Sequence, residues 1–175
     1  TEQRRIENEI ALQKEKELNS FLQKKSNWKE FENILLYNNI TTFYHFTDKR
    51  NISSIIKNKG LYSWEFCDKA GIQIPFPGGD GLSRELDRKY RLQDFVRLSF
   101  CSDHPMQYRL YKEGKELILL KISTEVAYFQ HTAFSDINAT DSSHKHGSNV
   151  VDLQRINFDA TKRNYVKKED SDFKY

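Results

Sequence analysis

The stretch FYHFTDKRNISSIIKNKGL, residues 43–61, carries the local signals that decide the fold. Thr41 to Phe46 is rich in β-branched and aromatic residues, which favours a strand. The side chain of Asp48 can cap a helix, on which three isoleucines then share one face. Gly60 follows at the position where many helices end in a left-handed residue. The segment therefore predicts a strand, a tight turn, a helix and a glycine stop, in that order.

Two helices are predicted before this segment. Residues 2–25 are highly charged and contain no Gly or Pro, and their thin apolar stripe is too interrupted for a heptad coiled coil. Asn27 and Glu30 have the spacing of a capping box, and apolar residues then recur at three and four positions, so a second helix should end near Asn39. We therefore divide the chain into an N-terminal helical extension, residues 1–40, and a domain over residues 41–175.

Short elements are predicted after it. Residues 64–93 contain three glycines and two prolines within seven positions, which predicts a long loop. FVRLSF (95–100) predicts a buried strand, and a helix capped by Ser102 or Asp103 should follow. ELILLKI (116–122) has the strongest strand pattern in the chain. We expect short strands at 126–129 and 132–134, turns over 138–149, and a helix or extended segment over 150–158. This succession indicates an α+β fold.

Composition restricts the class of protein. The 175 residues are enough for one compact domain with an appendage, and an aromatic content of 13% argues against disorder. No apolar run approaches the roughly 20 residues that a membrane helix needs. The first residues do not resemble a secretion leader, so we expect a cytoplasmic protein in which Cys67 and Cys101 are free thiols. A net charge of +3 permits a polyanionic partner without requiring one.

Few motifs point to chemistry by themselves. His144 and His146 lie two positions apart, but a third ligand at a recognisable spacing is missing, so we expect no metal site. GGDGLS (78–83) lacks the Lys-Ser/Thr ending of a phosphate-binding loop. His45 and Thr47 lie where a strand meets a helix, so both side chains can project into one cleft and bind a ligand. A purely structural histidine in an aromatic strand is the alternative.

Four segments, taken together, resemble one enzyme family. FYHFTDKRNISSIIKNKGL, GGDGLSRELD, DFVRLSFCSDHPMQY and AFSDINATD follow one another between residues 43 and 141. In this order they resemble the DarT-like family of NAD-dependent ADP-ribosyltransferases, toxins that modify bases of single-stranded DNA and are usually neutralised by a macrodomain partner of the DarG type. The resemblance covers roughly residues 41–175. It implies an ADP-ribosyltransferase-like split twisted sheet that holds NAD, preceded here by the N-terminal helices.

The resemblance also implies an NAD site. His45 and Thr47 match the family's Y-H-x-T signature, and they would hold the nicotinamide ribose and amide. Asn51 matches a family asparagine on the same wall of the site. Ser99 and Phe100, in the segment similar to the family's second NAD-contacting strand, would flank the nicotinamide. An aromatic face and directional hydrogen bonds suit a planar aromatic amide.

Catalytic and DNA-contacting residues are implied in the same way. The family uses an arginine of the variable loop, for which Arg84 is preferred and Arg88 is the other candidate; its fork could clamp the pyrophosphate or assist proton removal from the base. A surface ion pair with Glu85 or Asp87 is the alternative for either arginine. The path of the accepting strand would be lined by Met106, Asn138, His144 and His146.

One catalytic group is not assigned. The family places a glutamate after a Gln-Ala pair, near the start of a late strand, to hold a ribose hydroxyl and stabilise developing charge. We expect that stretch just beyond Tyr175. Three alternatives therefore stay open: transfer to RNA or protein, a catalytically silent module that binds NAD or nucleic acid, and an interaction domain organised by the N-terminal helix.

Overall fold

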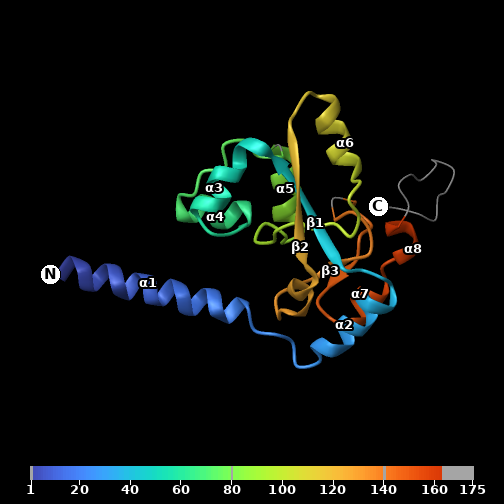
Figure 1. Cartoon of the computed structure of the whole chain (residues 1–175), viewed down its shortest axis with the longest axis horizontal. Coiled ribbons are helices and arrows are strands. Elements are labelled where there is room, and N and C mark those ends of the chain that lie inside the picture. The colour runs from blue at the N-terminus through green and yellow to red at the C-terminus, as the bar shows by residue number, and fades with distance from the viewer. Residues whose placement is uncertain (1, 80, 140, 163–175) are drawn as a thin grey trace.

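The computed structural model describes residues 2–79, 81–139 and 141–162. Helices and short strands alternate along the chain, which confirms the predicted α+β fold (Figure 1). In chain order the elements are α1 (Glu2–Phe21), α2 (Trp28–Tyr37), β1 (Thr42–Asp48), η1 (Lys49–Asn51), α3 (Ile52–Lys57), α4 (Trp64–Ala70), α5 (Gly81–Lys89), α6 (Pro105–Lys112), β2 (Leu117–Ser123), η2 (Thr124–Tyr128), β3 (Phe134–Ser135), β4 (His146–Gly147), α7 (Val150–Gln154) and α8 (Phe158–Thr161).

A two-stranded antiparallel ribbon runs through the centre of the molecule. Strands β1 and β2 pair from Thr42 opposite Ser123 to Asp48 opposite Leu117. A second, shorter sheet is formed by β3 and β4, so the strands fall into two separate pieces. In Figure 1, α3 and α4 lie to one side of the central ribbon and α6 to the other, near its upper end. Helices α2, α7 and α8 lie towards its lower end in this view.

The hydrophobic core lies where α2 meets the end of the ribbon and α7. Phe31 and Leu35, one turn apart on α2, are 0% and 1% exposed, and they join Phe43, Phe134 and Leu153 in one buried cluster. Full burial of such a side chain contributes about 1.5–3 kcal/mol. The division predicted at residue 40 places α2 in the extension, but this helix shares the core of the domain.

Helix α1 extends away from the rest of the protein (Figure 1). Ile6 and Ile10 of its apolar stripe are about half exposed, at 49% and 51%. The last residue of α1, Phe21, lies edge-on to His131 at 5.2 Å. Just after the helix, the Lys25 amide donates to the Tyr128 carbonyl at 2.7 Å and the Lys25 ammonium to the Phe129 carbonyl at 2.5 Å. The chain thus joins the folded body between α1 and α2.

No helix among the described residues combines the length and the apolar character that crossing a membrane requires. Cys67 and Cys101 are free thiols, as predicted.

The predicted long loop over residues 64–93 is wrong, because it contains α4 and α5. Helix α4 begins where the Ser63 hydroxyl accepts a hydrogen bond from the Phe66 amide at 3.1 Å. It ends at Gly71, whose φ of 65° is left-handed. Four of the prolines and glycines that suggested a loop lie in the connection between the two helices, and the fifth, Gly81, is the first residue of α5.

Two predicted strands are also wrong. Segment 95–100 is extended, but it pairs with β1 only at the bridge between Ser99 and Tyr44. The carbonyl of Arg97 binds the His45 side chain rather than a strand amide, and the side chains beside the bridge, Leu98 and Phe100, pack on the core. Residues 126–129 mostly belong to the 3-10 helix η2, whose first turn is capped by the Ser123 hydroxyl at 3.2 Å from the Glu125 amide.

Several helix ends differ from prediction. The left-handed residue after α3 is Lys59, with φ 54°, rather than Gly60. Asn27 begins α2 without a side-chain capping bond. The α6 cap is His104, whose Nδ1 accepts from the Met106 amide at 3.1 Å, rather than Ser102 or Asp103. Of the late segments, 132–134 contributes only Phe134 to β3, 138–149 contains β4, and 150–158 contains α7 and the start of α8.

Candidate active site

His45 lies in the middle of β1 with its ring half-buried. Its Nδ1 is 2.9 Å from the carbonyl oxygen of Arg97. Because a carbonyl can only accept, Nδ1 is assigned the proton and Nε2 is left as an acceptor. Burial lowers the pKa of His45 below its ordinary value of 6.5, against the opposing effect of that hydrogen bond. The imidazole is therefore neutral at pH 7. Two backbone hydrogen bonds between Tyr44 and Ser99, at 2.8 and 2.9 Å, hold the segment that carries Arg97 against β1.

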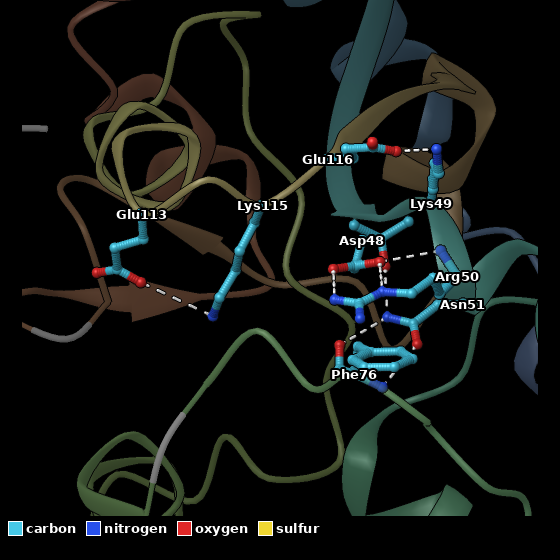
Figure 2. Close-up of polar contacts among 9 residues, drawn as sticks. Asp48, Lys49, Arg50, Asn51, Phe76, Glu113, Lys115 and Glu116 are labelled. Atoms are coloured by element: carbon cyan, nitrogen blue, oxygen red, sulfur yellow. Dashed lines mark hydrogen bonds and ion pairs between the residues drawn. The ribbon is translucent and has the colours of Figure 1, made fainter.

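Thr47 lies two residues further along β1, on the same face as His45. Its hydroxyl accepts a hydrogen bond from Nδ2 of Asn51 at 3.0 Å. Asn51 is only 5% exposed, and its carboxamide also binds both backbone groups of Phe76: Nδ2 donates to the carbonyl at 2.7 Å and Oδ1 accepts from the amide at 3.0 Å (Figure 2). Both amide hydrogens are thus used within the protein. Asn51 ties the connection between α4 and α5 to the end of β1.

The ring of Phe76 is contacted by a second side chain, that of Arg50. The Arg50 guanidinium carbon lies 3.2 Å from the centroid of the Phe76 ring. Asp48 holds this guanidinium, accepting from Nε at 2.8 Å and from Nη2 at 2.7 Å (Figure 2). The hydrogen bonds from Arg50 lower the pKa of Asp48 to about 2. We call Asp48, Arg50, Asn51 and Phe76 the Phe76 latch, since they hold both backbone and ring of one loop residue.

Ser99 and Phe100 follow the segment that binds His45. The Ser99 hydroxyl accepts from the Cys101 amide at 3.2 Å. The ring of Phe100 packs edge-on against Phe43 and Phe158, with centroid distances of 5.1 and 5.8 Å. The structure therefore places Ser99 beside β1 through its backbone and turns the Phe100 ring onto the core.

The two candidate arginines share one face of α5. Their guanidinium groups lie over the Trp64 ring, 4.9 Å from its centroid for Arg84 and 4.8 Å for Arg88. Arg84 also forms an exposed ion pair with Asp68, with 3.2 Å between Nη1 and Oδ2. An open groove of about 430 Å³ beside it is lined by Asp68, Ile72 and Arg84 together with neighbouring loop residues. Arg84 thus combines a positive charge with access to an open concave surface.

Asp87 does not pair with either candidate arginine, contrary to the alternative considered from the sequence. Its carboxylate accepts from the Trp64 indole at 2.9 Å and forms an ion pair with Arg97. Arg97 and Trp64 were not predicted as site residues. Only the charge of Arg97 inside an apolar FVRLSF segment could have indicated a role, because Trp64 and Asp87 are 23 positions apart and no local pattern joins them.

The predicted DNA-contacting histidines meet the end of α5. His144 and His146 are stacked, with centroids 5.0 Å apart and 3.0 Å between Nε2 and Nδ1. The Asp141 carbonyl holds His144 Nδ1 at 2.7 Å. Tyr90, directly after α5, lies edge-on to His144 at 4.9 Å. The structure therefore brings this stack to the helix that carries both arginines.

The other two predicted DNA contacts lie in neighbouring turns. Met106 is in the first turn of α6, and the carbonyl of Asn138 accepts from the Asp141 amide at 2.8 Å. Within the described part of the chain, no three or more His, Cys, Asp or Glu side chains are grouped as a metal would need. Residues 163–175, which precede the expected glutamate stretch, lie outside the described residues.

This chain is similar to proteins of one known family. No curated protein matches the chain. A solved structure, Thermus sp. 2.9 DarT in complex with ADP-ribosylated ssDNA, is similar in fold, with a TM-score of 0.50 and 18% identity over 75% of this chain and 70% of that chain. Residues 44–175 match the family model described as ssDNA thymidine ADP-ribosyltransferase, DarT. Since this match spans most of the sequence, the chain belongs to the DarT family of ssDNA thymidine ADP-ribosyltransferases.

Proposed function

We propose that this protein transfers ADP-ribose from NAD to a thymidine base of single-stranded DNA. In this reaction the bond between nicotinamide and ribose breaks, nicotinamide leaves, and the base takes its place on the ribose with loss of a proton. The observation that carries the proposal is a neutral, half-buried imidazole on β1 with Nε2 left as an acceptor, at the centre of the segment that matches the DarT family.

NAD is the co-substrate in this proposal, and the β1 face fits its nicotinamide end. His45 Nε2 can accept a hydrogen bond from a ribose hydroxyl or from the carboxamide, and Thr47 offers a hydroxyl on the same face. Ser99 and Phe100 would form the adjoining wall, Phe100 mainly through its backbone because its ring packs on the core. Asn51 would act by holding the Phe76 latch beside the ligand.

Arg84 is the preferred catalytic arginine, and Arg88 is the other candidate. Arg84 is partly exposed beside an open groove, and among the described side chains it pairs with the exposed Asp68. A pyrophosphate can displace such a weakly held partner, because an exposed ion pair contributes at most about 1 kcal/mol. The planar guanidinium fork suits two phosphate oxygens.

Single-stranded DNA would lie along the stack formed by Tyr90, His144 and His146. Aromatic and imidazole rings accept unpaired bases by stacking, largely irrespective of sequence. Met106 and Asn138 would border this path. The similar Thermus protein was solved with ADP-ribosylated ssDNA, which supports the same class of acceptor here. We further propose a cytoplasmic location and neutralisation by a macrodomain partner of the DarG type.

The test is transfer of labelled ADP-ribose from NAD to matched oligonucleotides. We expect label on single-stranded DNA that contains thymidine, and none on the same sequence without thymidine. RNA and protein acceptors in parallel reactions test the alternative acceptors. His45→Ala should abolish transfer and weaken NAD binding. His131→Ala is the control and should change neither, because this histidine is exposed and lies outside the candidate site.

Two results would contradict the proposal. Labelling of protein or RNA with no labelling of DNA would replace the acceptor. NAD binding measured by calorimetry without any release of nicotinamide would favour the catalytically silent module.

A further inference from the structure

The carboxylate of Asp87 joins three segments of the candidate active site. Its side chain is 15% exposed and lies on α5. Oδ2 accepts from the Trp64 indole of α4 at 2.9 Å, and Oδ1 accepts from Nη2 of Arg97 in the extended segment. Both oxygens are therefore used, each by a different part of the chain.

One of these contacts orients the surface on which the arginines lie. Arg84 and Arg88 are each less than 5 Å from the Trp64 ring centroid. The indole N–H is the only polar handle of that ring, and Asp87 binds it. The orientation of the indole thus sets the place of both guanidinium groups.

The other contact reaches the imidazole. The backbone carbonyl of Arg97 accepts the Nδ1 proton of His45 at 2.9 Å, so the position of this residue sets which ring nitrogen is left for a ligand. The Arg97 Nε is buried and has no hydrogen-bond partner among the described residues, which leaves the ion pair with Asp87 as the anchor of the guanidinium. Removal of Asp87 would leave a partly buried charge uncompensated.

We propose that Asp87 is a positioning residue that holds the arginine pair of α5 and the imidazole of β1 in register. It does not touch substrate; it acts through Trp64 on Arg84 and Arg88, and through Arg97 on His45. The expected effect on the reaction rate rests on the proposed function. The expected effect on the His45 proton and on the Trp64 orientation does not.

The experiment uses the full chain with two substitutions in the ion pair and one matched control. Asp87→Asn keeps the shape and removes the charge, while Arg97→Gln keeps the carbonyl that binds His45 and removes the guanidinium. Arg155→Gln is the control, because Arg155 pairs with Asp152 at 2.6 Å with side-chain exposures of 45% and 11%, close to the 40% and 15% of Arg97 and Asp87. The readouts are kcat, KM for NAD, melting temperature, and the NMR signals of the His45 ring nitrogens and the Trp64 indole.

We expect all three variants to lose similar thermal stability. Only Asp87→Asn and Arg97→Gln should lower kcat, by about 10- to 100-fold, since a displacement of about 1 Å in a site costs on this order. In both, the His45 nitrogen signals should shift towards a mixture of tautomers, and Asp87→Asn should also move the Trp64 indole signal.

Unchanged kcat and unchanged His45 signals in both variants would overturn the proposal and leave Asp87 with a structural role. If Asp87→Asn does not fold, Arg97→Gln decides alone. If the wild-type protein transfers no ADP-ribose at all, the proposed function fails, but the NMR shifts still show whether Asp87 couples the two halves of the site.

Discussion

At the scale of single residues, the site depends on protonation states set by neighbours. His45 is neutral because burial lowers its pKa, and the bond to the Arg97 carbonyl fixes its one proton on Nδ1. Asp48 is ionised because Arg50 binds both of its oxygens. Over the physiological pH range, His45 is thus neutral and Asp48 is ionised, as their hydrogen bonds require.

The first prediction concerns the pH dependence of the reaction. Burial lowers the pKa of His45 below 6.5, so Nε2 becomes protonated, and stops being an acceptor, only below that pH. We expect kcat/KM for NAD to be constant as pH rises above 6.5 and to fall as pH drops below it. A pH profile of initial rates measures this, and an acid limb with its midpoint above 6.5 would contradict the neutral, acceptor role.

The second prediction concerns acid stability. The folded-state pKa of Asp48 is about 2, below its ordinary 3.8, so its ion pair contributes fully above pH 3.8 and is lost as pH falls towards 2. Asp48→Asn should therefore be less stable than wild type at pH 5, and the difference should shrink between pH 3.8 and 2. Urea unfolding at stepped pH measures it; a constant difference over that window would show that Asp48 does not act through its charge.

At the scale of elements, the connection between α4 and α5 is held rather than free. It contains several prolines and glycines, yet the Phe76 latch ties its middle to the end of β1 (Figure 2). Because α5 follows this connection directly, the latch also limits where Arg84 can lie. A loop with weak secondary structure thereby becomes one wall of the site.

The third prediction tests the latch. Asn51→Ala removes hydrogen bonds to Thr47 and to both backbone groups of Phe76, and it should cost about 1–3 kcal/mol of the free energy of unfolding. Limited proteolysis should then cut within residues 71–79 much faster than in wild type. Asn38→Ala is the control, since that side chain also binds a backbone carbonyl, at 2.8 Å, but caps the C-terminus of α2. Equal cutting rates in the two variants would rule out a latch.

At the scale of the whole molecule, the two N-terminal helices have different roles. Helix α1 extends away from the body, whereas α2 supplies Phe31 and Leu35 to the centre of the core (Figure 1). The bonds of Lys25 to the residues that follow η2 fix the chain between them. Only α1 can therefore be removed without loss of core residues, so a separate N-terminal interaction segment would end with α1.

The fourth prediction follows from this difference. Deletion of residues 1–20 should change the melting temperature little, because the exposed α1 side chains contribute almost no burial. Deletion of residues 1–40 should unfold the protein, since truncation of one buried Phe such as Phe31 already costs about 3–5 kcal/mol. Circular dichroism melts of both truncations measure this. Normal NAD affinity after removal of residues 1–40 would instead support the division predicted at residue 40.

The sequence predicted best where neighbouring residues carry the signal. The strand at β1, the Asp48 cap and the strong strand ELILLKI depend on residue type and spacing over a few positions, and all three are present. Segments 95–100 and 126–129 have strand composition too, and their apolar side chains pack on the core. Their backbones, however, form no strand. Propensity cannot separate these outcomes, because both bury the same side chains.

The sequence by itself indicated the family and the α+β class. It also predicted which residues would bind and react: a histidine and a threonine on one strand face, and two arginines one helical turn apart. Only the tertiary structure decided which partners these residues have. Arg97 binds His45 across 52 positions of sequence, and Asp87 binds Trp64 across 23 and Arg97 across 10. Such contacts are set by how helices pack beside the central ribbon, and packing depends on the whole chain rather than on local spacing.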